Sequence, residues 1–380
     1  MSGPLPAAPD YGHNTLAEVL GAVACRLGAG GHDPWGLPKA RGYVVLLVDG
    51  LGWHQLRRHL SILEYFPELL GEARPISAAV PSTTAVSLTT LGTGLPPGQH
   101  GIVGYTFRTA PGGRVLNALH WGSGDPQPEL FQPHPTWFQR LEQAGVAVST
   151  VARAKFSDSG LTRAGLRGGS YHPVDDVGTQ QRIEEICRTV ATPGPALAYV
   201  YEGDLDHSGH AFGVDSSRWR ACLARIDHDL ELLRRALPGD VCLLVTGDHG
   251  MIDVPAGAQI LFEDEPQLRS GVDLLSGEGR FRQLYTGSAD AVAARWSRCL
   301  GDRAWVCTRR DAAEAGWFGP VLGASAAGRL GDVLVAMRGN WAVMTTARPH
   351  ELELIGQHGS LSDEEMRVPL VVDEGWGGQS

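Results

Sequence analysis

The stretch "VVLLVDGLGW", residues 44–53, places a carboxylate at the end of a strongly apolar run. Its first five residues are all aliphatic, and Asp49 and Gly50 follow them directly. A run without polar alternation is typical of a strand in a parallel sheet that is covered on both faces. Ligands of such sheets bind beyond the carboxyl ends of the strands. We therefore predict a central strand at 42–50 that delivers Asp49 to a functional site.

Similar apolar segments recur along the chain, separated by segments with the hydrophobic spacing of helices. The other predicted strands are 145–153, 196–204 and 240–250, and the intervening helices are 136–145, 181–191 and 216–237. Buried strands that alternate with amphipathic helices indicate a parallel sheet between two helical layers. The predicted fold class is therefore α/β, a three-layer sandwich with a largely parallel central sheet.

The pattern changes between residues 255 and 345, where short strands are expected at 281–287, 304–309 and 331–339. We interpret this region as a smaller α+β cap inserted into a catalytic domain formed by residues 1–254 and 346–380. After the insertion, Ser362 is positioned to cap a short acidic helix, which leads into a last apolar strand of the main sheet.

Composition limits the possible partners. The chain has 380 residues, with 32 Lys and Arg against 42 Asp and Glu, so its formal net charge is −10. This charge disfavours binding to a nucleic acid duplex. Six cysteines without a C-x-x-C pair are interpreted as reduced core thiols. The N-terminal segment resembles no secretion signal and no run reaches the roughly 18 apolar residues that span a bilayer, so we expect a cytoplasmic protein without membrane contact.

Acidic and imidazole side chains follow the predicted strands. Asp206 and His210 lie four residues apart in "DLDHSGHAFG" (204–213), so that one helical turn would place them on the same face. Asp248 and His249 lie in "GDHG", and His358 lies in "GQHG". Carboxylate and imidazole ligands suit Zn²⁺, with Mn²⁺ as a harder alternative. Without a cation, carboxylates so close together would repel one another.

A candidate nucleophile lies in "VPSTTAVSLTTLGTGLPP" (80–97). Pro81, Ser82, Thr83 and Thr84 precede an apolar run, as expected for the start of a helix whose free N–H groups can bind an anion. An ordinary Ser/Thr helix cap is the alternative interpretation. A threonine hydroxyl attacks phosphorus at neutral pH only if a metal lowers its pKa.

The ordered motifs VDG, PSTT, HGI, DLDHSGHAFG, GDHG and GQHG resemble the alkaline phosphatase superfamily, and more closely its nucleotide pyrophosphatase/phosphodiesterase branch. This resemblance implies that one zinc is held by Asp49, Thr84, Asp248 and His249, and the other by Asp206, His210 and His358. It also implies that Thr84 is the nucleophile and forms a covalent phospho-threonine. A sulfatase is disfavoured, because Ser82 does not stand in the required C/S-x-P-x-R setting.

One position departs from the pattern of the branch. After "HGI" this branch commonly has an asparagine that donates to a phosphoryl oxygen, whereas this chain has Tyr105. A phenol can also donate, so we predict Tyr105 as a catalytic residue. Arg108 and Lys155 are considered as further phosphate contacts, and the alternative, favoured interpretation of each is a solvated surface charge. The departure affects the expected substrate more than the expected chemistry.

The resemblance implies a two-metal hydrolase that cleaves phosphodiester or pyrophosphate bonds of nucleotides or related small molecules. One alternative is a phosphomonoesterase or phosphate mutase of the same superfamily. Another is a non-catalytic protein that binds metal or phosphate. The oligomeric state is left open.

Overall fold

The computed structural model describes residues 4–71, 73–175 and 178–375. Its main sheet has seven strands in the order β2-β17-β8-β1-β7-β5-β6. The five strands from β8 to β6 are parallel to one another, and β17 runs antiparallel to both of its neighbours. The strands are β2 (Arg74–Ser77), β17 (Arg367–Asp373), β8 (Val241–Gly247), β1 (Gly42–Val48), β7 (Ala196–Glu202), β5 (Ala147–Ala152) and β6 (Ser170–Pro173).

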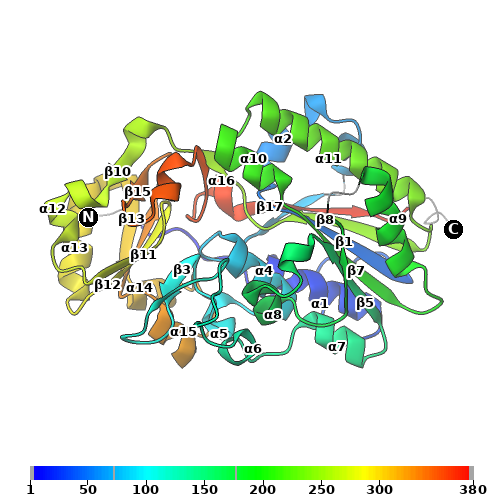
Figure 1. Ribbon diagram of the computed structural model, residues 1–380, viewed down its shortest axis with the longest axis horizontal. Helices are drawn as coiled ribbons and strands as arrows, with labels where there is room; N and C mark the ends of the chain where they lie inside the picture. The colour runs from blue at the N-terminus through cyan, green and yellow to red at the C-terminus, as the bar shows by residue number, and fades with distance from the viewer. Residues whose placement is uncertain (1–3, 72, 176–177, 376–380) are drawn as a thin grey trace.

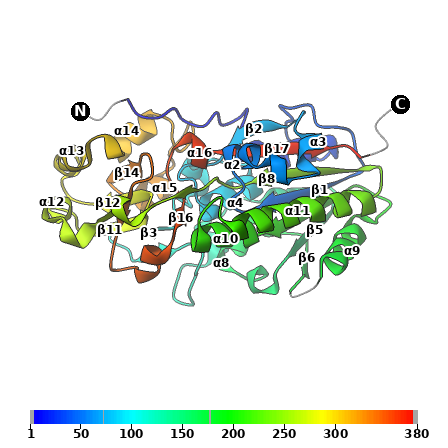
Figure 2. The same ribbon diagram turned by 90° about the horizontal axis from the view of Figure 1, so that it is seen from above.

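Helices cover both faces of this sheet, as Figure 1 and the view from above in Figure 2 show. One layer contains α2 (Trp53–Arg58), α9 (Thr179–Val190), α10 (Asp204–Phe212) and α11 (Ser217–Ala236). The opposite layer contains α1 (Leu16–Arg26), α4 (Thr84–Thr93), α7 (Trp137–Gln143) and α8 (Gly160–Gly165). The predicted three-layer α/β sandwich with a largely parallel sheet is therefore confirmed.

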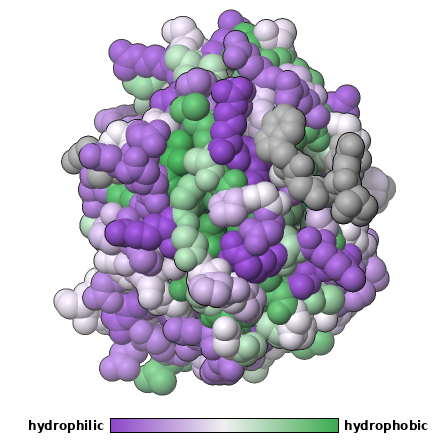
Figure 3. Space-filling view, turned by 90° about the vertical axis from the view of Figure 1, so that its right-hand side faces the viewer, coloured by the Kyte–Doolittle hydropathy of each residue, from purple (hydrophilic) through white to green (hydrophobic). Residues whose placement is uncertain are grey.

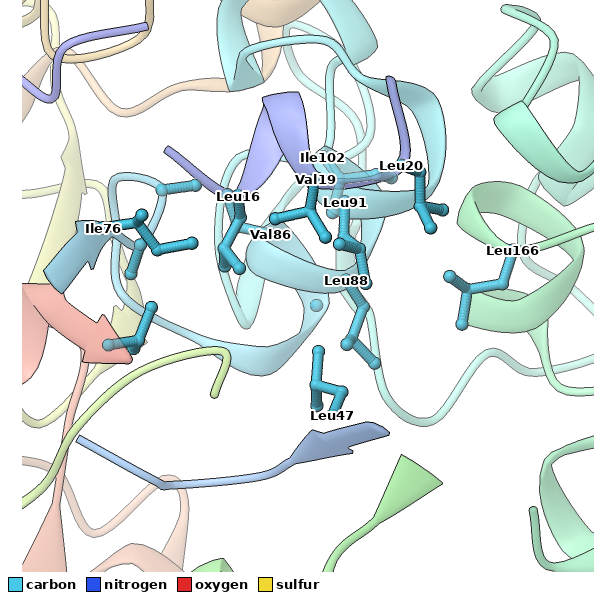
Figure 4. Close-up of a cluster of buried hydrophobic side chains, with 14 of the residues drawn as sticks. Leu16, Val19, Leu20, Leu47, Ile76, Val86, Leu88, Leu91, Ile102 and Leu166 are labelled. Atoms are coloured by element: carbon cyan, nitrogen blue, oxygen red, sulfur yellow. The ribbon is translucent and has the colours of Figure 1, made fainter. Parts of the chain in front are cut away.

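Alternation along β1 explains why the strand is apolar throughout. Val44, Leu46 and Val48 belong to the core beneath α9 and α11, whereas Val45 and Leu47 belong to the core beneath α1 and α4. Figure 4 shows this second core, in which Leu47 faces Leu88 of α4 and Leu16 and Val19 of α1 lie beyond. Because neighbouring residues of a strand point to opposite faces, a strand between two helical layers has no polar position.

Local signals set the ends of several helices. Thr15 and Glu18 form a capping box at the start of α1, and Thr136 and Gln139 form one at the start of α7. Helix α4 ends at Gly94, whose φ of 70° lies in the left-handed region that glycine adopts without strain. Of these helices, α7 was predicted with both of its ends, at 136–145, and the structure agrees with that prediction to within two residues.

A second, antiparallel sheet lies beside the main one, on the left in Figure 1, with the order β11-β12-β14-β13. Its strands are β11 (Leu274–Glu278), β12 (Phe281–Tyr285), β14 (Val333–Met337) and β13 (Ala304–Thr308). The helices of this region are α12 (Pro266–Arg269), α13 (Ala289–Leu300), α14 (Arg309–Glu314) and α15 (Ala324–Arg329). Three of these strands fall where short strands were expected, and β11 was not predicted. The division of the chain at 255 and 345 stays a prediction.

Several shorter elements lie outside the two sheets. The strand pairs are β3 (Thr106–Arg108) with β4 (Val115–Asn117), β9 (Ile252–Asp253) with β16 (Gly356–Gln357), and β10 (Gln259–Leu261) with β15 (Ala342–Met344). The short helices are α3 (Phe66–Leu69), α5 (Pro97–His100), α6 (Pro128–Phe131) and α16 (Asp363–Met366). Ser362 precedes α16 as predicted, but its hydroxyl donates to the Glu365 carboxylate and caps no backbone N–H.

Two further expectations concern the surface and the cysteines. All six cysteines are free. Cys242 and Cys307 are buried, and Cys187, Cys222 and Cys299 are partly buried against the hydrophobic cores, whereas Cys25 is exposed, so the interpretation as a core thiol was wrong for Cys25. Within the described residues, no helix has the length and apolar character needed to cross a bilayer. Figure 3 shows the end of the molecule near the C-terminus, where hydrophilic side chains surround a narrow band of hydrophobic ones, as on a water-exposed surface.

Candidate active site

Three adjacent strands end at the same edge of the main sheet and deliver the predicted site residues there. Asp49 follows β1, and Asp248 and His249 follow β8, which pairs with β1. On the other side of β1, strand β7 leads into α10, which carries Asp206 and His210 one turn apart. Because the three strands are parallel, the side chains that follow them lie together at the carboxyl edge of the sheet, although they are distant in the sequence.

The remaining imidazole arrives from the C-terminal part of the chain. His358 follows β16, and its ring stacks on that of His249 with centroids 3.6 Å apart. The segment is tied to α10, because the backbone N–H of Ile355 donates to the carbonyl of His210 at 2.9 Å. The structure therefore places His358 beside both predicted ligand pairs.

One group of ligand atoms is centred on Asp206. Its Oδ1 lies 3.4 Å from Nε2 of His210 and 3.9 Å from Nε2 of His358. Two ligands that are each about 2.0 Å from a tetrahedral zinc are about 3.3 Å apart. The spacing of these atoms is thus close to that of atoms sharing one small cation.

A second group is centred on His249, which is completely buried. Its Nε2 lies 3.4 Å from Oδ1 of Asp49, 3.5 Å from Oδ2 of Asp248 and 3.3 Å from Oγ1 of Thr84. Asp206 also lies within reach of Asp49 and His249, so it joins the two groups. All seven residues predicted as metal ligands therefore meet in one cluster.

Backbone carbonyls orient the three imidazoles. Nδ1 of His210 bonds to the carbonyl of Gly356 at 2.7 Å, that of His249 to Gly250 at 3.0 Å, and that of His358 to Ser82 at 2.9 Å. A carbonyl only accepts, so each Nδ1 carries the proton and each Nε2 presents a lone pair to the cluster. Burial lowers the pKa of His358 well below its usual value, which favours the same neutral form.

The carboxylates of the cluster are incompletely satisfied. Oδ1 of Asp49, Oδ1 of Asp206 and Oδ2 of Asp248 are buried and have no hydrogen-bond partner. Burial, together with the charges of Asp248 and Asp206, raises the pKa of Asp49 well above its usual range. Burial also raises the pKa of Asp248. Divalent cations would supply partners for these oxygens and remove the repulsion, so the residues present fit a two-metal centre.

Thr84 is the first residue of α4, and it is buried at the edge of the cluster. The N-terminus of a helix carries free N–H groups and a partial positive charge, which favour an anionic oxygen nearby. Thr83 occupies the capping position, but its hydroxyl donates to Glu278. Of the neighbouring hydroxyl groups, that of Ser82 donates to the carbonyl of Ser360, away from the cluster.

A cavity of about 560 Å³ opens onto the cluster. Tyr105 lines it, with its hydroxyl 3.0 Å from Nδ2 of Asn117 and 3.3 Å from Nε2 of His350. Lys155 also lines the cavity, with Nζ 4.8 Å from the centroid of the Phe156 ring. Arg108 does not belong to the lining, because its guanidinium stacks on Tyr285. The structure thus brings two of these three side chains to the cavity.

Two residues of the site were not predicted from the sequence. Tyr201, at the end of β7, donates its hydroxyl hydrogen to Oδ2 of Asp49. Glu278, at the end of β11, projects from the second sheet into the cavity. Tyr201 could have been found from its place next to the strand end at Glu202, whereas nothing in "LLSGEG" (274–279) marks Glu278.

Comparison with known proteins identifies a matching sequence family and a human relative. Residues 43–361 match the sequence family described as type I phosphodiesterase / nucleotide pyrophosphatase. Human ectonucleotide pyrophosphatase/phosphodiesterase family member 7 is 23% identical over 180 residues. That alignment spans 41% of this chain and only 39% of the length of the human protein.

Two solved structures share the fold. Murine ectonucleotide pyrophosphatase/phosphodiesterase 5 is 20% identical, with a TM-score of 0.69 over 86% of this chain and 87% of the murine one. The murine protein has also been solved as an inactive variant in complex with AMP. Phosphonoacetate hydrolase from Sinorhizobium meliloti 1021, in complex with phosphonoformate, is 18% identical, with a TM-score of 0.67 over 90% of this chain and 92% of the hydrolase.

Proposed function

Because the chain belongs to the type I phosphodiesterase/nucleotide pyrophosphatase family, we propose that it is a two-metal hydrolase of phosphodiester or pyrophosphate bonds in nucleotides or related small molecules. The observation that carries this proposal is the position of Thr84, whose hydroxyl lies 3.3 Å from His249 at the edge of the two ligand groups. The complexes of the structural neighbours with AMP and phosphonoformate support a small phosphorus-containing substrate.

We assign Asp49, Thr84, Asp248 and His249 to one metal and Asp206, His210 and His358 to the other. Zn²⁺ fits this set of carboxylate oxygen and imidazole nitrogen, and Mn²⁺ is the second choice. When bound, such a metal pair lowers the pKa of a coordinated hydroxyl and neutralises charge on the attacking and leaving oxygens.

The protein residues have separate parts in the proposed reaction. The Thr84 hydroxyl loses its proton as its oxygen attacks phosphorus, the bond from phosphorus to one ester oxygen breaks, and that leaving oxygen takes up a proton. The resulting phospho-threonine keeps the other ester arm until water breaks the bond between phosphorus and the Thr84 oxygen and restores the hydroxyl. The N-terminus of α4 favours a phosphoryl oxygen beside Thr84. Tyr105 is positioned in the cavity wall to donate to another phosphoryl oxygen, and Lys155 is placed to attract the anionic substrate. We further propose that residues 255–345 act as a cap, because they contribute Glu278 and Gly279 to the wall.

Replacing the proposed nucleophile tests the mechanism. Thr84→Ala should lower kcat on bis-p-nitrophenyl phosphate by more than about 1,000-fold, since removal of a covalent nucleophile abolishes its pathway. Ser87→Ala is the matched control, because the Ser87 hydroxyl lies one turn further along α4, buried and without a partner. Activity of Thr84→Ala within a few-fold of the parent, with equal metal content by mass spectrometry, would contradict the assignment.

The alternatives make different predictions. A phosphomonoesterase or phosphate mutase would prefer p-nitrophenyl phosphate or a phosphoglycerate over the p-nitrophenyl diester of thymidine monophosphate. A non-catalytic binding protein would hydrolyse none of these compounds after zinc or manganese is added. Initial rates on this set of substrates, measured with the metal-loaded protein, therefore separate the three functions.

A further inference from the structure

Ser82 connects the segment that carries the proposed nucleophile to the loop that carries His358. Its backbone N–H donates to the carbonyl of Gly359 at 3.2 Å, and its own carbonyl accepts from Nδ1 of His358 at 2.9 Å. Its hydroxyl donates to the carbonyl of Ser360 at 2.6 Å and accepts the backbone N–H of Gly359 at 3.2 Å. Each polar group of Ser82 is thus bonded to residues 358–360, although Ser82 and His358 are 276 residues apart in the chain.

These bonds lie outside the cavity and are shielded from water. Ser82 does not line the cavity, so it has no contact with a bound substrate. Ser82 and Ser360 are fully buried, and Gly359 is buried as well. Because water cannot replace a buried partner, loss of the hydroxyl would leave the N–H of Gly359 and the carbonyl of Ser360 unsatisfied. The hydroxyl therefore favours one position of the loop over all others.

The two connected segments serve different groups of candidate ligands. Thr84 follows Ser82 by two residues, and its Oγ1 lies 3.3 Å from Nε2 of His249. His358, in contrast, belongs to the ligand group centred on Asp206. Ser82 thus lies between the nucleophile and the second ligand group, and its bonds determine how far apart the two segments are.

The opposite side of the same loop is held by the second sheet and by α16. The hydroxyl of Ser360 donates to the carbonyl of Met337, the last residue of β14, at 2.6 Å. The backbone N–H of Ser360 donates to Oε1 of Glu365 in α16 at 3.0 Å. These bonds fix the loop relative to the second sheet, whereas the bonds to Ser82 fix it relative to α4. Without the Ser82 hydroxyl, the position of the loop would depend more on the second sheet than on the nucleophile.

On the basis of the proposed function, we propose that Ser82 is a positioning residue that sets the place of His358 relative to Thr84. Its carbonyl orients the imidazole, and its hydroxyl holds the backbone on which that imidazole is carried. A residue that orients a metal ligand in this way strengthens metal binding without touching the metal. Ser82 thereby couples occupation of the metal site of Asp206, His210 and His358 to the position of the nucleophile.

Titration of the metal-free full chain with Co²⁺, followed by visible absorption, tests this inference. The wild type should bind Co²⁺ in two steps, and His210→Ala identifies the step that belongs to the Asp206 group. Ser82→Ala should weaken that step by about 10- to 100-fold, as for loss of a partner that orients a ligand, and leave the other step unchanged. The control Ser87→Ala removes a buried hydroxyl of α4 that has no partner, so it should leave both steps unchanged.

Two further measurements separate positioning from a general effect on stability. In the His210→Ala background, Ser82→Ala should not alter the remaining step. At saturating Co²⁺, Ser82→Ala should lower kcat on bis-p-nitrophenyl phosphate by about 10- to 100-fold, because displacement of a reacting group by about 1 Å costs up to about 100-fold. KM should stay nearly unchanged, since the cavity wall is intact. Should Ser82→Ala not fold, Ser82→Cys fills the same space with a weaker donor, and the same results are expected.

The inference is overturned if Ser82→Ala leaves both steps unchanged, or if it weakens both steps equally, as a general loosening of the fold would. Unchanged kcat at saturating Co²⁺ would also overturn it. If the wild type binds fewer than two Co²⁺ ions, the proposed two-metal function fails and the role of Ser82 fails with it. Binding in two steps that Ser82→Ala does not alter would overturn the role of Ser82 alone.

Discussion

Tyr201 and Asp49 form the most informative residue pair around the candidate metal centre. The Tyr201 hydroxyl donates to Oδ2 of Asp49 and leaves Oδ1 directed at the cluster. Partners of this kind fix the orientation of a ligand, and their loss typically weakens metal binding by about 10- to 100-fold. We therefore expect Tyr201→Phe to weaken binding of the metal held by Asp49 by that factor, as measured by competition with a chelator.

Tyr199 provides the control for this prediction. It precedes Tyr201 by two residues on β7 and also lines the cavity, but its hydroxyl is buried without a hydrogen-bond partner. Tyr199→Phe should therefore leave metal affinity unchanged within a few-fold. Equal losses in both variants would mean that the aromatic wall, and not the bond to Asp49, determines affinity.

A buried ion pair joins the second sheet to the segment that carries His358. Arg280, next to β12, contacts both carboxylate oxygens of Glu365 in α16, at 3.1 Å and 2.7 Å, and neither side chain is exposed. Glu365 also accepts the backbone N–H of Ser360, two residues after His358. The pair therefore holds both the second sheet and the His358 loop in place.

Breaking this pair from one side should strongly destabilise the fold. Glu365→Gln leaves the Arg280 charge buried without compensation, so we expect the free energy of unfolding to fall by about 3–5 kcal/mol in urea titrations. Its neighbour Glu364 pairs with Arg58 at the surface, and Glu364→Gln should cost less than about 1 kcal/mol. A loss below 1 kcal/mol for Glu365→Gln would show that packing alone holds the loop.

The sequence predicts the central strands of the main sheet better than the strands at its edges. The strands β1, β5, β7 and β8 were predicted because burial on both faces makes them continuously apolar. The edge strand β6, "SYHP", is only partly buried and lacks that signal, and β11 was missed because Ser276, Gly277 and Glu278 interrupt its pattern. The same interruption hid Glu278, whose place in the cavity depends on how the two sheets pack.

The clustering of the three aspartates was easier to foresee, because Asp49 and Asp248 directly follow strands and Asp206 lies in the first turn of the helix after one. The carboxyl ends of parallel strands lie at the same edge of a sheet, so the positions of Asp49, Asp206 and Asp248 along the chain predict their proximity. The orientation of the imidazoles could not be predicted, since it depends on carbonyls of Gly250, Gly356 and Ser82 that only the fold brings near. The role of these residues as ligands stays a prediction.

Metal should couple the site to the stability of the whole chain, since a cation that binds only the folded state stabilises it by mass action. At free zinc of about 100 times its dissociation constant, each site should add about 2.7 kcal/mol to the free energy of unfolding. Asp206 joins both ligand groups, so Asp206→Ala should remove most of this increment. Asp204, two residues earlier, pairs with Arg153 and Arg225 outside the cavity wall, and Asp204→Ala should retain it. Denaturation with zinc and with a chelator measures the increment, and an equal zinc response in all three proteins would place the metal elsewhere in the molecule.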